Sequence, residues 1–191
     1  MKILSVMSCV CFPLVTSMGA EAEEVQGIRM ISEFDGSENE PKWFSVDDGV
    51  MGGLSKGGAE LKDGSMVFSG KLSLENNGGF SSLRTGDRKY DFTGKSGFVL
   101  RVKGDGRTYK LRIETDARFN GSEIGYQADF ETEAGKFVEV KVPFDTFKPG
   151  WRGRKLEGPP LDLSKVEEMG LVLADGKEGA FEIKVDWIGV E

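Results

Sequence analysis

The sequence predicts an all-β sandwich with one short helix, on three observations. Short segments with alternating apolar residues follow one another from Ile28 to the C-terminus, and Gly, Asn and Asp separate them, a pattern typical of strands joined by tight turns. Only one segment has the features of a helix. The 191 residues show no repeat or second domain boundary, and a chain of this length can bury the core of one domain.

Two pairs of strands are predicted in the middle of the chain. The clearest hairpin covers residues 97–114, where apolar residues alternate on both sides of a Gly104-Asp105-Gly106 turn. Period-two alternation around such a turn is a strong hairpin signal. A second pair joins residues 124–131 to residues 138–142, and Pro143 ends it because proline cannot donate to a ladder.

Shorter elements complete the prediction. Residues 65–74 and 79–83 form two strands, and the last strand runs from Phe181 to Val190. Trp187 and Ile188 are adjacent apolar residues in that strand, so we expect a bulge or burial of both faces there. The helix is predicted from Ser164, with a capping box formed by Ser164 and Glu167, to a stop at Gly170.

The N-terminus predicts an export signal over residues 1–22. Lys2 is followed by about a dozen apolar or small residues, and Ala20-Glu21-Ala22 supplies an A-x-A end, as in secretory signals. The apolar run is too short to span a bilayer, and no arginine precedes Arg29, which argues against a transit peptide. We therefore expect a periplasmic or secreted protein, with no stable membrane insertion after the signal is removed.

Composition excludes several functions. The chain has no histidine, and both of its cysteines, Cys9 and Cys11, lie in the predicted signal. Thiolate and imidazole zinc sites and Cys-His or Ser-His catalysis therefore have no side chains to use. The net charge of −7 argues against a nucleic-acid partner. We expect no enzymatic activity, no cofactor and no metal.

The stretch from Trp43 to Ser55, WFSVDDGVMGGLS, is central to the functional prediction. Asp47 and Asp48 are followed by an apolar tip between glycines, and glycines allow sharp turns with positive φ. In the first interpretation, this is a tight loop that folds Met51 under a β-sheet. In the second, Asp47, Asp48 and the glycine amides line a ligand or partner site; a hard cation is a weaker reading, because adjacent strand residues point to opposite faces.

Three further regions hold candidate binding residues. Strand alternation would gather polar side chains on one outer face, around Arg112 and Gln127, either as solvated ion pairs or as a groove for a sugar or peptide; the set is Arg101, Lys103, Lys110, Arg112, Gln127, Asp129, Glu139 and Lys141. A glycine-rich loop over residues 75–84 presents Phe80 and Arg84. The aperiodic stretch 143–160 contains Trp151 and Arg152, a pair typical of protein interfaces.

Together these segments resemble the complex I intermediate-associated protein 30 family. The resemblance covers residues 23–191 almost completely and runs in order through Trp43, Asp47 to Gly53, Ser55, Phe68 to Gly70, Gly78 to Ser82, Arg84, Gly104 to Arg107, Tyr109, Tyr126, Gln127, Phe130, Pro143, Phe144, Phe147, Arg152 and Gly153. It implies a galactose-binding-like jelly roll, akin to carbohydrate-binding modules and without an enzymatic role. The best-known members assist assembly of respiratory complex I in mitochondria, from which the predicted export signal departs.

The main functional prediction is a non-catalytic module that binds or assists assembly of a protein client in the cell envelope. The alternative is a carbohydrate-binding module that takes a glycan on its polar sheet face. A hydrolase based on paired carboxylates is a remote third hypothesis.

Overall fold

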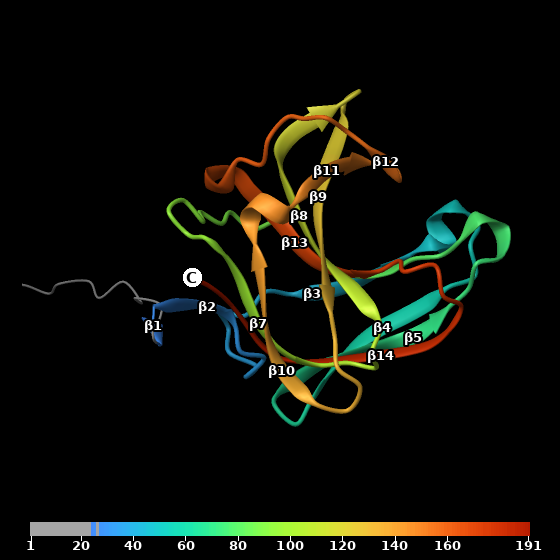
Figure 1. Ribbon diagram of the computed structural model, residues 1–191, viewed down its shortest axis with the longest axis horizontal. Helices are drawn as coiled ribbons and strands as arrows, with labels where there is room; N and C mark the ends of the chain where they lie inside the picture. Colours follow the sequence, from blue (N-terminus) through green and yellow to red (C-terminus); the bar gives the residue numbers. More distant parts are fainter. Residues whose placement is uncertain (1–23, 26) are drawn as a thin grey trace, which may run out of the picture.

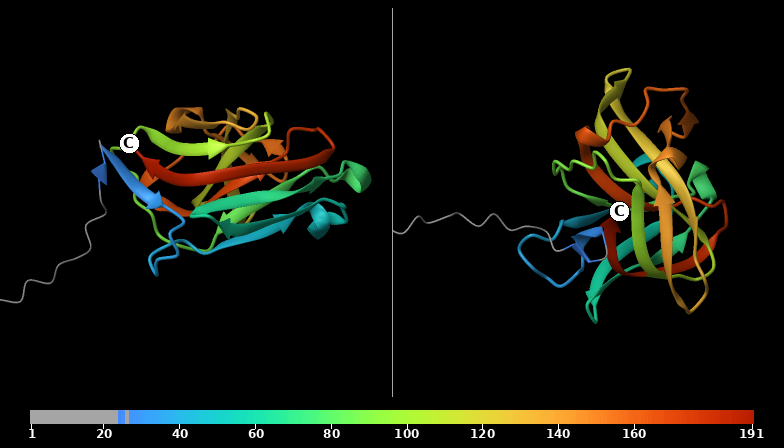
Figure 2. Two further views of the ribbon diagram at one scale, coloured as in Figure 1. Left: turned by 90° about the horizontal axis from the view of Figure 1, so that it is seen from below. Right: turned by 60° about the vertical axis from the view of Figure 1, so that its left-hand side comes forward.

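A computed structural model describes residues 24–25 and 27–191 and shows two antiparallel sheets packed face to face (Figures 1 and 2). The predicted signal, residues 1–22, lies outside the described residues. The all-β prediction is confirmed, because nearly every element is a strand. The core of the jelly-roll sandwich lies between the two sheets, and the rings of Phe68, Phe92, Phe98 and Tyr109 are almost fully buried in it.

The first sheet, sheet A, is organised around the last strand. One edge of β14 pairs with β7, and its other edge pairs with β5 and then with β2. The strands of sheet A are β1 (Glu24–Val25), β2 (Ile28–Ser32), β4 (Lys56–Lys62), β5 (Ser65–Leu72), β7 (Gly97–Lys103), β10 (Phe137–Pro143) and β14 (Gly179–Val190). β4 and β10 lie at its two edges.

The second sheet, sheet B, has the order β12-β11-β9-β8-β13-β6-β3. Its strands are β3 (Trp43–Asp47), β6 (Ser81–Thr85), β8 (Thr108–Phe119), β9 (Ser122–Glu131), β11 (Lys148–Trp151), β12 (Arg154–Lys155) and β13 (Val166–Leu173). Four single 3-10 turns connect strands: η1 (Asp48–Met51), η2 (Glu75–Asn77), η3 (Phe144–Thr146) and η4 (Leu163–Lys165).

The predicted hairpin over residues 97–114 is wrong in its pairing, although both strands exist. β7 belongs to sheet A and β8 to sheet B, so the Gly104-Asp105-Gly106 turn carries the chain across the sandwich. The Asp105 carboxylate fixes this crossing, because it accepts hydrogen bonds from the Tyr109 hydroxyl at 3.2 Å and from the Glu182 N–H of β14 at 3.0 Å. Alternation predicts a strand but does not say which strand lies beside it.

The second predicted pair is wrong for the same reason. β9 pairs with β8 and β11, whereas β10 pairs with β7 in the other sheet. Two hairpins that the structure does contain are β8–β9, which turns at Asn120-Gly121, and β4–β5, which turns at Asp63-Gly64. All four turn residues have positive φ, as the favoured two-residue hairpin turns require. Both dipeptides are visible in the sequence, and they were the better signal.

The predicted helix from Ser164 to Gly170 is also wrong. The Asp162 side chain accepts the Ser164 N–H at 3.0 Å and stabilises only the single turn η4. The chain then enters β13, which is almost entirely buried between β6 and β8. A Cβ at Gly170 would overlap the carbonyl oxygen of Leu83, so the glycine allows strand contact instead of ending a helix. Tertiary packing overrides the capping pattern.

Two smaller expectations have clear outcomes. The register of β14 shifts between Val185 and Trp187, so the predicted bulge is confirmed. The stretch 143–160 is less irregular than predicted, since it contains η3, β11 and β12. The polar set expected on one face is split between the sheets: Arg101, Lys103, Glu139 and Lys141 lie on sheet A, and Lys110, Arg112, Gln127 and Asp129 lie on sheet B.

Candidate functional site

Asp48 is a buried carboxylate that joins two loops far apart in the sequence. It is 0% exposed. Its Oδ1 accepts the Ser55 N–H at 2.9 Å, and its Oδ2 accepts the Ser55 hydroxyl at 2.5 Å and the Gly79 N–H at 2.7 Å, with the Phe80 N–H at 3.3 Å. The β3–β4 loop is thereby tied to the β5–β6 loop. The two loops lie side by side at the far right of Figure 1.

These bonds also control the charge of Asp48. Burial by itself raises the pKa of this carboxyl, but the hydrogen bonds from Ser55, Gly79 and Phe80 outweigh burial and hold the pKa below its ordinary value of 3.8. The carboxylate is therefore ionised at neutral pH. Protein donors surround this carboxylate, so in this geometry it holds the two loops together. The expectation that Asp48 lines a ligand site stays a prediction.

Two glycines make room for the Asp48 side chain. A Cβ at Gly53 would overlap the Asp48 carboxyl group, and one at Gly78 would lie 2.7 Å from its Oδ2. We expect Gly53→Ala to lower the free energy of unfolding by about 1–3 kcal/mol, the usual cost of overpacking. Gly49→Ala is the matched control in the same loop, because its added methyl group meets no atom within 4 Å. Thermal or urea unfolding of both variants measures the difference, and equal stabilities would contradict this account.

Asp47 has a similar but weaker structural role. Its Oδ1 accepts the Ser81 hydroxyl at 2.6 Å, and its Oδ2 accepts the Gly57 N–H of β4 at 3.0 Å. Asp47 therefore ties β3, at the edge of sheet B, to β4, at the edge of sheet A.

The tip of the joined loops exposes apolar side chains. Val50 is 74% exposed, Met51 64%, Leu54 52% and Leu74 43%. The interpretation that folds Met51 under a sheet is therefore wrong. Asn76 donates from its side-chain amide to the Gly52 carbonyl at 3.3 Å, so the two loops are linked here as well as at Asp48. We call the four exposed side chains the apolar tip.

On the outer face of sheet B, several candidate residues line up across the strands. Six residues stand directly opposite one another in neighbouring strands: Phe44, Arg84, Gly170, Arg112, Gln127 and Lys148. The structure thus brings together Arg84, Arg112 and Gln127, which come from three separate segments. Phe80 does not join them; it lies in the loop that Asp48 holds.

Arg112 is the buried centre of this row. Its Nη1 donates to Glu168 Oε1 at 2.5 Å, its Nη2 contacts Glu114, and the residue is 8% exposed. Burial lowers the pKa of Arg112 to about 10, and the nearby positive charge of Arg84 lowers it as well. The negative charge of Glu168 raises this pKa and offsets part of the decrease. Burial likewise raises the pKa of Glu168. Arg84 is more exposed and lies 3.8 Å from Glu168. The face is thus an ion-pair network.

Trp151 and Arg152 sit at the turn between β11 and β12. The Arg152 guanidinium lies 5.0 Å from the centre of the Trp151 ring. The ring centres of Trp151 and Phe119 are 5.4 Å apart in an edge-to-face arrangement. Trp151 is half-buried and Arg152 is exposed. Their role as a partner anchor stays a prediction.

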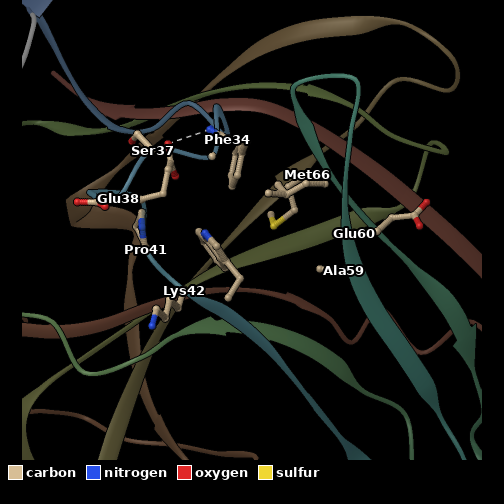
Figure 3. A pocket seen from close by; sticks show the side chains of 12 residues that line it. Phe34, Ser37, Glu38, Pro41, Lys42, Ala59, Glu60 and Met66 are labelled. Carbon is tan, nitrogen blue, oxygen red and sulfur yellow. Dashed lines mark hydrogen bonds between the residues drawn. The ribbon is translucent and has the colours of Figure 1, made fainter.

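A pocket that sequence reasoning missed opens between the edges of the two sheets (Figure 3). Its volume is about 430 Å³. Figure 3 shows Phe34 and Met66 pointing toward its centre, while Glu38 and Glu60 point away. Trp43 lines it as well, and its indole N–H has no acceptor among the described residues. The alternation of Ala59 and Leu61 before Asp63-Gly64 was the available signal for this edge strand.

The loop over the pocket is fixed by one carboxylate. Glu40 Oε1 accepts the N–H groups of Glu33 at 2.7 Å and Phe34 at 2.9 Å, and its other oxygen contacts the Ser32 hydroxyl. Phe34 adopts φ 55°, a costly value for a side chain of this size that persists only where the surroundings impose it. The pocket wall is therefore preformed.

Within residues 24–25 and 27–191, no group of three or more Asp, Glu, Cys or His side chains is placed to bind a metal ion. No helix in the same described part of the chain is long and apolar enough to cross a membrane.

Known structures with this fold include sugar-binding modules. The chain superposes on the family 11 carbohydrate-binding module of a cellulosomal cellulase from Clostridium thermocellum with a TM-score of 0.64, at 16% identity, over 87% of this chain and 95% of that one. An agarase, AgWH50C, matches with a TM-score of 0.62 at 13% identity, over 87% of this chain and 24% of that one. At such identities the likeness shows the fold alone.

Curated relatives share more of the sequence. The mouse protein named complex I intermediate-associated protein 30, mitochondrial, is 30% identical over 183 residues, which are 85% of this chain and 56% of that protein. The Drosophila melanogaster protein of the same name is 27% identical, over 78% of this chain and 58% of that protein. The chain thus spans about half the length of the curated relatives it matches.

These names correct the predicted localisation. The expectation of an exported, periplasmic or secreted protein is wrong, because the relatives are named mitochondrial. That expectation depended on a short apolar run and an A-x-A end within residues 1–22, and such local features are a weak guide to the compartment.

The family profile described as complex I intermediate-associated protein 30 matches residues 32–185. That range includes both loops tied by Asp48, the row across sheet B and the pocket. The chain belongs to the complex I intermediate-associated protein 30 family.

Proposed function

We propose that residues 23–191 form a non-catalytic protein-binding domain that assists assembly of a multisubunit complex through its apolar tip. The names of the relatives support an assembly role and suggest intermediates of respiratory complex I as the client. Asp47 and Asp48, the paired acids singled out from the sequence, support a non-catalytic role, because each is held in structural hydrogen bonds. Glu168, which the structure adds, is held in an ion pair with Arg112.

The apolar tip carries this proposal. Val50, Met51, Leu54 and Leu74 are exposed on loops that Asp48 holds in place. Scattered exposed apolar residues are common, but several on two loops that hydrogen bonds tie together suit an interaction site. Because its loops are already fixed, the tip loses little conformational entropy when a partner covers it.

Met51→Asp tests the proposal. Met51 is 64% exposed, and substitutions at such positions usually shift stability by about 0.5 kcal/mol or less. We therefore expect an unchanged thermal melt. Binding should fall by about tenfold or more, because a charge in an apolar interface is desolvated without a partner. The measurement is co-purification of complex I subunits with the tagged chain, quantified by mass spectrometry.

Met51→Leu is the matched control for this variant, because it keeps an apolar side chain of similar volume at the same exposed position. It should recover complex I subunits as well as the unmodified chain does. Equal recovery of complex I subunits by Met51→Asp and the unmodified chain would refute the role of the tip. A lowered melt of Met51→Asp would mean that the side chain is part of the fold.

A carbohydrate-binding module is the second candidate, favoured by one observation. Half-exposed Phe44 stands in register with Arg84 and, farther along the row, with Gln127, and an aromatic ring beside polar groups suits a sugar. The row is nevertheless dominated by an ion-pair network. Calorimetric binding of a glucan oligosaccharide, lost in Phe44→Ala and kept in Met51→Asp, would favour this candidate over a protein client.

A further inference from the structure

The edge strand β4 has backbone groups that no other strand uses. In an antiparallel strand, the N–H and C=O of one residue point to one neighbour and those of the next residue point to the other side. Gly57 donates its N–H to Asp47, away from β5. By alternation, the N–H and C=O groups of Ala59 and Leu61 also point away from β5. Within the described residues, nothing bonds to them there.

The pocket lies directly beside these free backbone groups. Ala59, Glu60 and Leu61 form one wall, and Trp43, from the neighbouring edge strand β3, belongs to the lining as well. Ala59 stands opposite Phe68 and Leu61 opposite Met66, so both side chains are on the core-facing side of sheet A. Leu61 is nevertheless 63% exposed, because the sandwich is open at this edge.

The two edges are joined at one end and separated at the other. β3 and β4 lie next to one another, and the Asp47 carboxylate bridges them at Gly57. At the other end of the two strands, the pocket lies between Trp43 and Leu61, and Phe34 and Met66 also line it. Edge strands with free backbone groups and exposed apolar residues are normally covered or charged to prevent pairing. Here Ala59 and Leu61 on the core-facing side of β4 are apolar and uncovered, and the charged residues of the strand, Lys56, Glu60 and Lys62, lie on its other face.

We propose that β4 accepts an extended segment of a partner protein as an added strand, with apolar side chains of that segment filling the pocket. The free N–H and C=O groups require a peptide backbone, and strand addition at a sheet edge is a known mode of peptide recognition. The pocket selects apolar residues at alternate positions, because alternate side chains of a strand share one face. The peptide residues between these apolar ones lie on the same face as Lys56, Glu60 and Lys62, so we expect them to be polar.

This proposal depends on the proposed function only in taking a protein as partner, since its site is different. The probe is a fluorescein-labelled heptapeptide, KFTVTLK, within a panel that varies its three apolar positions. The matched control, KTFVLTK, has the same composition but groups its apolar residues. We expect KFTVTLK to bind at least about tenfold more tightly than KTFVLTK, and to shift the amide NMR signals of Ala59 and Leu61.

Ala59→Pro removes one free N–H and leaves the β4–β5 ladder intact, because proline is tolerated where the N–H faces away from the sheet. We expect it to weaken KFTVTLK binding by about tenfold, while Ala59→Val, which keeps the N–H, stays within about threefold of the unmodified chain. A version of KFTVTLK with N-methylated valine and leucine tests the same hydrogen bonds on the unmodified protein, because in an antiparallel pair the residues that fill the pocket also turn their N–H groups toward β4. It should also lose binding.

Three results would overturn the proposal. They are a dissociation constant above about 1 mM for every peptide of the panel, equal affinities of KFTVTLK and KTFVLTK, and unchanged affinity of the N-methylated peptide. Self-association that Ala59→Pro abolishes would identify a second copy of this chain as the occupant instead. Met51→Asp should still bind KFTVTLK, and Ala59→Pro should still recover complex I subunits through the apolar tip. A failure of either site is thus distinguishable from a failure of the other.

Discussion

Asp48→Ala is expected to lower the free energy of unfolding by about 4 kcal/mol or more, because each buried donor left without an acceptor costs about 1–3 kcal/mol and Asp48 accepts from four donors. The donors are the Ser55 N–H and hydroxyl and the N–H groups of Gly79 and Phe80. They belong to two loops that are also joined by the Asn76 contact, by the Asp48 N–H with the Phe80 carbonyl, and by the Ser55 hydroxyl with the Ser73 backbone. Urea denaturation followed by fluorescence measures the loss.

Asp47→Ala is the graded control for Asp48→Ala. Asp47 accepts only two hydrogen bonds, and its side chain is partly exposed, so water can replace part of what is lost. We expect a cost of about 1–2 kcal/mol for this variant. A loss below about 1 kcal/mol in Asp48→Ala would contradict the conclusion that Asp48 holds the apolar tip.

The pH dependence of Asp48→Asn follows from the lowered pKa of Asp48. A carboxyl with a lower pKa in the folded state than in the unfolded state stabilises the protein when it is ionised. The stability difference between the unmodified chain and Asp48→Asn should therefore be constant above the ordinary value of 3.8. It should shrink as the pH falls through the still lower pKa of the folded state.

The sequence could predict the strands with clear alternation, because strand alternation depends only on neighbouring residues, but it missed β4 and gave a helix where β13 begins. It could not predict how the strands pair. The Gly104-Asp105-Gly106 turn has the composition of a hairpin, yet Asp105 bonds to Glu182, 77 positions away. The same limit explains the helix error, since Gly170 is required by its contact with the Leu83 carbonyl on another strand.

The sequence could single out the stretch that contains Asp48, but not the contacts that Asp48 makes. In the stretch from Trp43 to Ser55, the adjacent acidic residues suggested a ligand site, which stays a prediction. Only the fold shows that Gly79 and Phe80 supply the donors that Asp48 binds. The pocket was not predictable, because its walls come from Phe34, Trp43 and Met66, which lie in three segments without a common motif.

The second large effect concerns the buried ion pair on sheet B. Arg112→Met is expected to lower the free energy of unfolding by about 3–5 kcal/mol, because removing one partner of a buried pair leaves an uncompensated charge. Glu168 would lose its 2.5 Å partner and keep only Arg84, which is 3.8 Å away. Since an apolar pair of similar volume can replace a buried ion pair, the double variant Arg112→Met with Glu168→Leu should recover most of the loss.

The control is Arg101→Met on the other sheet. Arg101 pairs with Asp186, but both side chains are substantially exposed, and such pairs contribute about 1 kcal/mol or less. A double-mutant cycle over Arg112 and Glu168, measured by urea denaturation, isolates their coupling. Coupling near zero would show that the pair does not stabilise the sheet. The row from Phe44 to Lys148 would then need another reason for its buried charges, and a polar ligand on this face would become the better explanation.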